Sequence, residues 1–426
     1  MTSNKTFREC ISENNKEIII FAADNFAQFP QRDSFVASKC DRTLPAASAN
    51  DLVVLRGTLD REYHNWLRSV GLGSDLVVEY GENEKGITLS ELILGNPDPI
   101  MDIIEETGRK PVYVPWFSSI VENEAAKVLG AELFGASASE TLRYNDKASF
   151  KNICQELKIP VVEGVSFEMQ PLNSENYGKM KEAVMVYLQS YNTVIIRGTL
   201  GKSGTSLYKT TGIDIAEIYQ EISDSGEKVI IIEPFLNVSS SPNDQWIISR
   251  DGSIHHIGTF EQICKEGMLH SGNSNNIQLP EHSITYINNT SFKIISRMAK
   301  TGYIGVVGID YIVTDTDIFP VENNARFNGS SYVNLILENI EKLNAPTSAW
   351  KFMKVKVNPC SFNELIKDLE SSLYDGVKTN SIFPYNCEAL TDTGNFSVIL
   401  MAENIENISM LEQRVIELDG CNAGHF

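Results

Sequence analysis

GIDYIVTDTDIFPVENNARFNG, residues 308–329, has the pattern of a β-hairpin with polar side chains on one face. The runs on either side of TDTD are apolar and β-branched, as in strands, and TDTD is typical of a turn. A turn centred on Thr316 places Asp310 opposite Glu322, and Asn324 follows on the same face. Two carboxylates about 5 Å apart in a half-buried sheet repel unless a hard cation lies between them. The stretch predicts a magnesium site with Arg326 beside it as a phosphate or carboxylate ligand; a surface hairpin with solvated acids is the alternative.

A helix start upstream of the hairpin carries a lysine where a helix favours anions. In RYNDKASFKNICQELKIP, Asp146 is positioned to cap a helix of which Lys147 is the first residue. The helix dipole disfavours a cation at this end, so Lys147 fits better beside a bound phosphate. An exposed, solvated lysine is the alternative that this residue alone leaves open.

A glycine-rich loop between two predicted strands lies in NTVIIRGTLGKSGTSLYKT, residues 192–210. A P-loop is excluded, because its first glycine would fall on Ile196 and because SLYKT predicts a strand where a P-loop enters a helix. We expect a flexible flap whose backbone N–H groups close over a triphosphate, with an ordinary hairpin as the alternative. The candidate nucleotide contacts here are Arg197, Lys202, Ser203 and Gly204.

A buried strand follows in KVIIIEPFL, residues 228–236, and ends in Glu233, Phe235 and Leu236. An acidic residue followed by exposed backbone and apolar side chains at a strand end is compatible with an adenine slot. Taken singly, this signal is weak.

The order of these pieces resembles the ATP-grasp superfamily over residues 141–345, and the D-x11-E-x-N-x-R spacing of the hairpin is the most specific element. In that superfamily two α/β lobes close on Mg-ATP, a carboxylate attacks the γ-phosphate, and a nucleophile, commonly an amine, captures the acyl phosphate. The resemblance implies phosphate contacts from Lys147 and Arg197 and adenine contacts from Glu233 and Leu236. It also implies magnesium ligation by Asp310, Glu322 and Asn324, and stabilisation of the transferring phosphoryl group or acyl phosphate by Arg326. Arg197 departs from the lysine of many members, which changes geometry but keeps the charge.

A closer similarity is carried by SPNDQWIISRDGSIHHIGTFEQICKEGMLHSG, residues 241–272, which resembles a segment of pheganomycin-type peptide ligases. Those proteins carry an N-terminal pre-ATP-grasp domain and a small C-terminal domain. The resemblance implies amide-bond formation in specialised metabolism, with amino acids or peptides as substrates, and a homodimer. It makes Gln245, Arg250 and Gln262 candidate substrate contacts, although exposed strand positions also explain them. The butirosin-type ligase that loads glutamate onto a carrier protein is a related possibility, and a non-catalytic nucleotide-binding module, a carboxylase or a kinase-like transferase are the rivals.

Three regions organise the chain. Residues 1–140 alternate short apolar runs with helical stretches, which predicts an α/β layer with a largely parallel, Rossmann-like sheet. Residues 141–345 form the expected ATP-grasp domain, with the flap lobe at about 148–235, and residues 346–426 read as a small α+β domain. That last region holds Lys351, Lys354 and Lys356, which form either a docking patch for an acidic carrier protein or a solvated stripe.

Composition narrows the class of protein. The chain has 426 residues, 42% of them hydrophobic and 22% charged, as expected for a globular protein of two or three domains. A net charge of −20 argues against sequence-independent nucleic-acid binding. No apolar run reaches the roughly 20 residues of a membrane span, and the N-terminus lacks the apolar region of a signal peptide, so we expect a cytoplasmic protein. The seven cysteines are odd in number and widely spaced, so we expect them to be reduced and structural.

Overall fold

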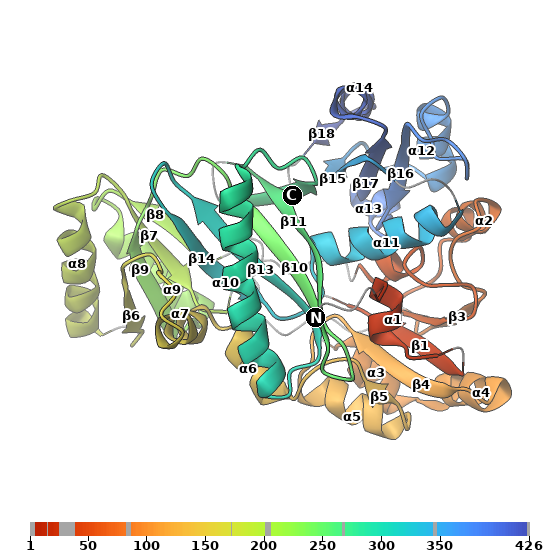
Figure 1. Cartoon of the computed structure of the whole chain (residues 1–426), viewed down its shortest axis with the longest axis horizontal. Coiled ribbons are helices and arrows are strands. Elements are labelled where there is room, and N and C mark those ends of the chain that lie inside the picture. Colours follow the sequence, from red (N-terminus) through yellow and green to blue (C-terminus); the bar gives the residue numbers. More distant parts are fainter. Residues whose placement is uncertain are drawn as a thin grey trace.

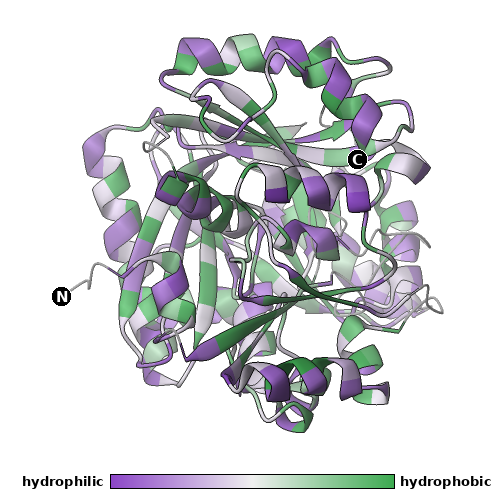
Figure 2. Ribbon diagram, turned by 90° about the vertical axis from the view of Figure 1, so that its right-hand side faces the viewer, coloured by the Kyte–Doolittle hydropathy of each residue, from purple (hydrophilic) through white to green (hydrophobic). Residues whose placement is uncertain are grey.

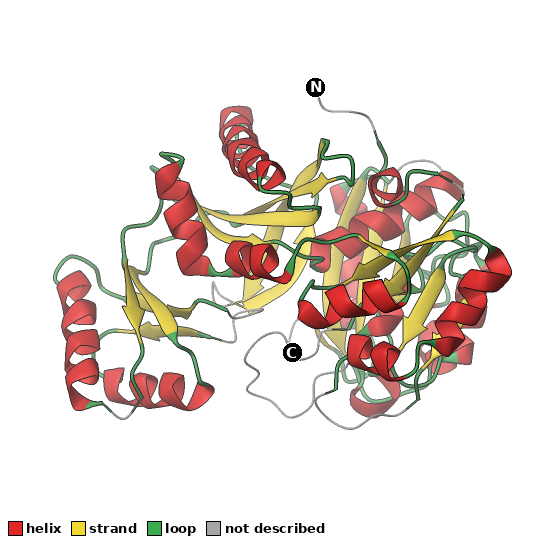
Figure 3. Ribbon diagram, turned by 90° about the horizontal axis from the view of Figure 1, so that it is seen from below, coloured by secondary structure: helices red, strands yellow, loops and turns green. Residues whose placement is uncertain are grey.

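The structure is a computed structural model that describes residues 5–14, 16–24, 39–81, 87–171, 173–200, 206–265, 269–343 and 347–423. Three sheets organise it. In Figure 1 a small lobe lies at the left, a long central sheet crosses the middle, and the N-terminal sheet lies at the right beneath the C-terminal strands and helices. Seen from below, the small lobe stands apart from the rest of the molecule (Figure 3).

The N-terminal sheet has five parallel strands in the order β3-β2-β1-β4-β5. Strand β1 is buried along its whole length, because its EIIIFA run lies in a parallel sheet that is covered on both faces. The predicted, largely parallel layer is therefore confirmed. Its strands are β1 (Glu17–Ala22), β2 (Leu52–Leu55), β3 (Leu76–Glu79), β4 (Lys110–Pro115) and β5 (Glu132–Leu133), and its helices are α1 (Phe7–Ile11), η1 (Cys40–Thr43), α2 (Arg61–Ser69), α3 (Leu89–Gly95), α4 (Asp98–Thr107) and α5 (Ile120–Val128).

The small lobe is an antiparallel sheet of order β6-β9-β7-β8 with two helices packed on it. Apolar side chains at alternate positions of β7 and β9 form its core with residues of both helices. As predicted, the loop after Arg197 joins two antiparallel strands. The elements are β6 (Val165–Glu168), α8 (Ser174–Leu188), β7 (Val194–Gly198), β8 (Leu207–Thr210), α9 (Ile215–Ser225) and β9 (Val229–Pro234). Two helices precede the lobe, α6 (Ala138–Asn145) and α7 (Lys147–Glu156).

The central sheet is antiparallel, with strand order β14-β13-β10-β11-β12-β15-β17-β16, and β18 pairs with β15. Its first strands are β10 (Pro242–Ile248), β11 (Ile254–Lys265), β12 (Leu269–Ser274), β13 (Gly305–Val313) and β14 (Ile318–Asn324). The strands of the C-terminal region continue the same sheet: β15 (Ala349–Lys356), β16 (Ser381–Tyr385), β17 (Asn395–Ala402) and β18 (Asn422–Ala423). The helices around it are α10 (Glu281–Lys300), α11 (Gly329–Leu343), α12 (Phe362–Leu369), α13 (Leu390–Thr393) and α14 (Ile405–Ile416).

The junction between β12 and β15 is unusually close. A Cβ atom at Gly272 would lie 2.1 Å from the carbonyl oxygen of Phe352 on β15. Real side chains do not tolerate that distance, so glycine is required for the two strands to pair here.

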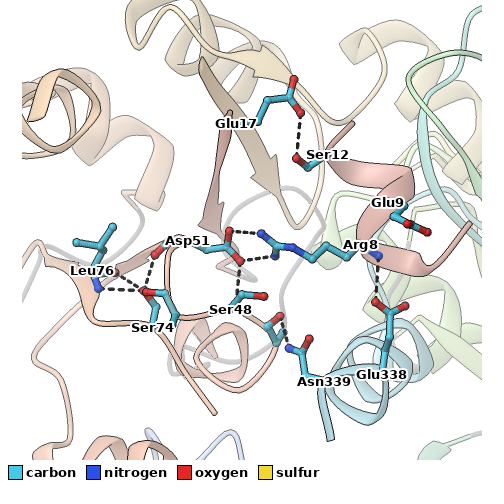
Figure 4. Close-up of polar contacts among 12 residues, drawn as sticks. Arg8, Glu9, Ser12, Glu17, Ser48, Asp51, Ser74, Leu76, Glu338 and Asn339 are labelled. Carbon is cyan, nitrogen blue, oxygen red and sulfur yellow. Dashed lines mark hydrogen bonds and ion pairs between the residues drawn. The ribbon is translucent and has the colours of Figure 1, made fainter. Parts of the chain in front are cut away.

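A polar network fixes α11 against the N-terminal sheet (Figure 4). Arg8 binds the buried carboxylate of Asp51 with both terminal nitrogens, at 2.5 and 2.6 Å. The backbone N–H of Phe7 donates to Glu338 Oε2 at 2.5 Å, and Asn339 Nδ2 donates to the carbonyl oxygen of Ala46 at 2.9 Å. Helix α11 is thus held at two successive positions, which matters because its first residues enter the cavity described below.

Hydropathy follows this architecture. The surface helices alternate hydrophilic and hydrophobic residues, whereas the inner strands are predominantly hydrophobic (Figure 2). Among the described helices, none combines the length and the apolarity that a membrane crossing requires.

Candidate active site

A cavity of about 320 Å³ lies where the small lobe, the central sheet and the N- and C-terminal regions meet. At one end it is lined by β7, β8 and β9 of the small lobe, in the middle by the β13–β14 hairpin, and at the other end by residues of the N- and C-terminal regions. Cavities of this size hold small molecules.

The hairpin has the predicted pair at Asp310, although its register shifts by one residue between Asp310 and Tyr311. Asp310 pairs directly with Glu322 across β13 and β14. Asn324 Nδ2 donates to Asp310 Oδ2 at 2.9 Å, and Asn243 on β10 donates to Asp310 Oδ1 at 2.5 Å. Burial, and then the neighbouring Glu322, raise the pKa of Asp310 to about 7. The pKa of Asp310 is raised although Arg326 opposes the effect, and a divalent cation bound between the two carboxylates would offset their repulsion.

The donor set fits a hard divalent cation. Two carboxylates and the side-chain oxygen of Asn324, if its amide turned, are the oxygen ligands that magnesium takes in proteins. In the described part of the chain, no three His, Cys, Asp or Glu side chains gather in a metal-binding arrangement. An ion held by Asp310, Glu322 and Asn324 would complete its coordination with oxygens from outside the protein, such as water or phosphate.

Lys147 lies beside the hairpin rather than in solvent. Its Nζ is 3.2 Å from Glu322 Oε1, and only 5% of its side chain is exposed, which excludes the solvated alternative. The predicted cap is confirmed, because Asp146 Oδ1 accepts from the backbone N–H of Ser149 at 2.7 Å. The backbone N–H of Lys147 donates to the carbonyl oxygen of Thr199 at 3.1 Å, which joins the start of α7 to the beginning of the flap.

Glu233 is held between two cations. Arg197 Nη2 lies 2.7 Å from Glu233 Oε2, and Lys151 Nζ lies 2.6 Å from Glu233 Oε1, all three side chains being nearly buried. Arg197 also donates to the carbonyl oxygen of Val321 at 3.1 Å, which connects the small lobe to β14. Lys151 was not predicted as a site residue, although it follows Lys147 by one helical turn and therefore shares its face of α7.

An apolar slot lies next to these charges. Strand β9 ends at Pro234, and Phe235 and Leu236 line the cavity as predicted. The opposite wall of the slot, which β14 and other segments supply, was not predicted from the sequence. The apolar lining comprises Val162, Ile195, Leu207, Phe235, Leu236, Val238, Ile312 and Val321.

Arg326 is buried at the edge of the hairpin and lines the cavity. Its Nη1 donates to Asn145 Oδ1 at 2.6 Å, and Asn145 is in turn fixed by the carbonyl oxygens of Thr141 and Ala325 at 2.7 and 3.1 Å. Burial lowers the pKa of Arg326, and the carboxylates of Glu322 and Asp310 oppose that effect. Asn145 carries no motif signal, since its role depends on the packing of α6 against the hairpin.

The three candidate substrate contacts have different locations. Gln262 lines the cavity. Gln245 lies behind the lining, where it donates to the side chain of Asn243 and, at 2.9 Å, to Asn328 Oδ1. The prediction of Arg250 as a substrate contact is wrong, because Arg250 does not reach the cavity. It is paired with Glu17 at 2.9 Å and with Glu132, and it so joins β1 and β5 to the end of β10. Lys202, Ser203 and Gly204 lie outside the described residues.

The lysines of β15 do not form one surface patch, which corrects the predicted docking cluster. Lys351 is paired with Glu412 at 2.6 Å, and Lys356 is exposed. Lys354 lines the cavity, where its Nζ donates to the carbonyl oxygen of His270 at 2.8 Å. A docking surface for an acidic carrier protein loses its support with this arrangement.

A family model described as L-aspartate–L-methionine ligase, ATP grasp, matches residues 197–323. This range runs from Arg197 on β7 to Asn323 near the end of β14.

Solved structures of similar fold cover nearly the whole chain. A biotin carboxylase from Campylobacter jejuni in complex with β,γ-ATP is 14% identical, with a TM-score of 0.62, and the match covers 96% of this chain and 92% of that one. The biotin carboxylase domain of the 2-oxoglutarate carboxylase of Hydrogenobacter thermophilus, a dimer with MgADP, ADP and bicarbonate, is 12% identical over 96% of this chain and 91% of that one, with a TM-score of 0.59. An ADP complex of N5-carboxyaminoimidazole ribonucleotide synthetase is also 12% identical, over 94% and 95%, with a TM-score of 0.59. At these identities the likeness concerns the fold.

Proposed function

We propose that this chain, which has the ATP-grasp fold, is a ligase that uses ATP and magnesium to join a carboxylate to an amine, releasing ADP and phosphate. The observation that carries the proposal is the direct pairing of Asp310 with Glu322, with Asn324 and Lys147 in contact with them, in the middle of one cavity. A structural hairpin gains nothing from two facing carboxylates, whereas a metal–triphosphate site needs them.

The proposed nucleotide position follows from the lining of the cavity. The apolar slot takes the adenine between Leu236 of the small lobe and β14, and the main chain after Glu233 supplies hydrogen bonds to its edge. Lys147 and Arg197 face the phosphates, and Glu233 acts with Lys151 to keep Arg197 in place rather than to bind the base. Asp310, Glu322 and Asn324 would hold the magnesium, which offsets the charge of the phosphates when bound.

The proposed reaction has two steps. An oxygen of the substrate carboxylate attacks the γ-phosphorus as its bond to the ADP oxygen breaks, and the product is an acyl phosphate. The amine nitrogen then attacks the acyl carbon, the bond from that carbon to the phosphate oxygen breaks, and the nitrogen loses a proton. Arg326 is positioned to hold the carboxylate and then the phosphoryl oxygens, because its guanidinium is fixed by Asn145 beside the hairpin. The flap would exclude water from the acyl phosphate.

We further propose that both substrates are amino acids or peptides, so that the product contains a peptide bond. The support is the matching family model, whose description names two amino acids. A carrier-protein thiol as acceptor is disfavoured, since Lys354 lies in the cavity and Lys351 is paired with Glu412.

The test is incubation of the full chain with ATP, Mg²⁺ and pairs of amino acids, with ADP release and product mass as readouts. We expect a product with the mass of both amino acids less one water. Glu322→Gln is expected to lower the rate by at least about a hundredfold while the protein stays folded. The matched control is Asp315→Asn, which changes an exposed acid at the turn of the same hairpin. Near-normal turnover in Glu322→Gln would refute the assignment, and a stable phosphorylated product in place of an amide would point to a phosphoryl transferase.

A further inference from the structure

The end of the cavity remote from the small lobe collects polar side chains from regions that the proposed nucleotide position does not use. We call it the far end, defined by Lys39, Arg42, His270, Asn273, Lys354 and Asn386. Lys39 and Arg42 belong to the η1 segment, His270 and Asn273 to β12, Lys354 to β15, and Asn386 follows β16. The first residues of α11 also line it, and α11 lies between the N-terminal sheet and the C-terminal strands (Figure 1).

Lys354 is a half-buried cation that lines the cavity without a counter-charge. Among the residues that the structure describes, the acceptor of its Nζ is the carbonyl oxygen of His270, at 2.8 Å, and no carboxylate pairs with it. Burial, and then the charge of nearby Lys39, lower the pKa of Lys354 to about 7. An ammonium group that is partly removed from water and has only a neutral acceptor is incompletely compensated, and a chain with a net charge of −20 has many acids that could have paired with it.

Asn273 contributes an unused donor to the same end. The residue is fully buried, and its Nδ2 has no hydrogen-bond partner. Burial lowers the pKa of His270 to about 3, so the ring is neutral and its Nε2 donates to Asn273 Oδ1 at 2.7 Å. That bond fixes the orientation of the amide and leaves its N–H₂ group as the outstanding donor.

The backbone around the far end is strained. Three described residues other than glycine have positive φ, and two of them are Lys39 at 59° and Asn386 at 55°. Such conformations are uncommon for residues other than glycine, and they cluster at ligand sites. The N-terminus of α11 adds the positive end of a helix dipole to the two lysines.

We propose that the far end binds a second anionic group of the substrates, a carboxylate that is not activated, through Lys354 Nζ and Asn273 Nδ2 with Lys39 beside them. The inference rests on the proposed function, in that it treats the cavity as the substrate site. The carboxylate would come either from the side chain of the activated acid or from the α-carboxylate of the amine substrate. In both cases it supplies the charge that Lys354 lacks and the acceptor that Asn273 lacks.

The experiment measures binding rather than turnover, so that its result does not depend on the ligase activity. The full chain with Mg-ADP is titrated calorimetrically with two pairs of probes. Within each pair one member has a carboxylate where the other has an amide: L-glutamate against L-glutamine, and L-methionine against L-methioninamide. The first pair tests the side-chain source and the second tests the α-carboxylate. We expect one of the two carboxylates, the side-chain carboxylate of glutamate or the α-carboxylate of methionine, to make its amino acid bind at least about tenfold more tightly than the matching amide.

Lys354→Met is expected to remove this preference, while the affinity for the amide of the pair changes by less than about twofold. The matched control, Lys356→Met, changes an exposed lysine of the same strand and should keep the preference. Lys39→Met is a second variant, which keeps the proposal testable if Lys354→Met does not fold. It should also weaken the preference for the carboxylate. A wild-type protein without a charge preference overturns the proposal. So does a preference that survives both Lys354→Met and Lys39→Met, which would leave Lys354 a structural donor to His270.

Discussion

Glu233→Gln tests whether Glu233 organises cations, as its contacts indicate, or binds the base, as its position in the sequence implies. The substitution keeps the shape of the side chain but removes the charge between Lys151 and Arg197, at 2.6 and 2.7 Å. At an effective dielectric constant of about 20, each such pair is worth roughly 6 kcal/mol before desolvation. Breaking a buried pair from one side costs about 3–5 kcal/mol net, because a cation remains buried.

We therefore expect Glu233→Gln to lower the free energy of unfolding of the small lobe by about 3 kcal/mol or more. The assay is urea denaturation followed by hydrogen exchange in β7 and β9, which isolates the lobe from the other domains. Adding Lys151→Met should recover part of the loss, since it removes one of the stranded charges. Glu168→Gln, an exposed acid on β6 of the same sheet, serves as the control.

Nucleotide binding gives the second readout. If Glu233 acts through Arg197, the variant should lose affinity for the phosphates while its preference for ATP over GTP stays unchanged. A Glu233→Gln protein with wild-type stability and an altered base preference would refute this reasoning and restore the direct contact with adenine.

Other consequences of the structure are directly measurable. Arg250→Gln should destabilise the fold by about 3 kcal/mol, because it breaks the buried ion pair with Glu17, yet leave the KM values unchanged in steady-state kinetics. Gly272→Ala should lower the melting temperature sharply, since its Cβ would meet the Phe352 carbonyl oxygen at 2.1 Å. Chelation of magnesium should abolish both ADP release and the thermal stabilisation by ADP. Burial raises the pKa of Cys10 to about 11 and of Cys154 to about 12, so both thiols should react with a disulfide reagent only after unfolding.

The sequence was sufficient for features set by local geometry. The pairing of Asp310 with Glu322 was predicted from a turn centred on Thr316, but the structure reaches it through a register shift between Asp310 and Tyr311, which the sequence did not indicate. The cap at Asp146 and the hairpin after Arg197 are local features. Lys151 was within reach of the same logic through its helical spacing from Lys147.

Features that depend on long-range packing were not predictable. Lys39 and Lys354 are more than 300 residues apart in the sequence, yet both line one cavity. The pairing of β15 with β12, which places Lys354 there, is a long-range contact. Lys354 looked like part of a surface stripe because nothing in the strand itself shows that β15 has neighbours on both sides. Arg250 was misjudged for a similar reason, since its glutamate partners lie in the N-terminal sheet.

The continuity of the central sheet has a consequence for which molecules fit the cavity. The β13–β14 hairpin and the strands of the far end, β12 and β15, belong to one hydrogen-bonded array. Closure of the small lobe leaves the spacing within that array unchanged, because sheet pairing is stiffer than the segments that connect the lobes. If both proposed roles are correct, the sheet fixes the distance between the carboxylate that is phosphorylated and the carboxylate that the far end holds. Selection by length would then be independent of the position of the small lobe.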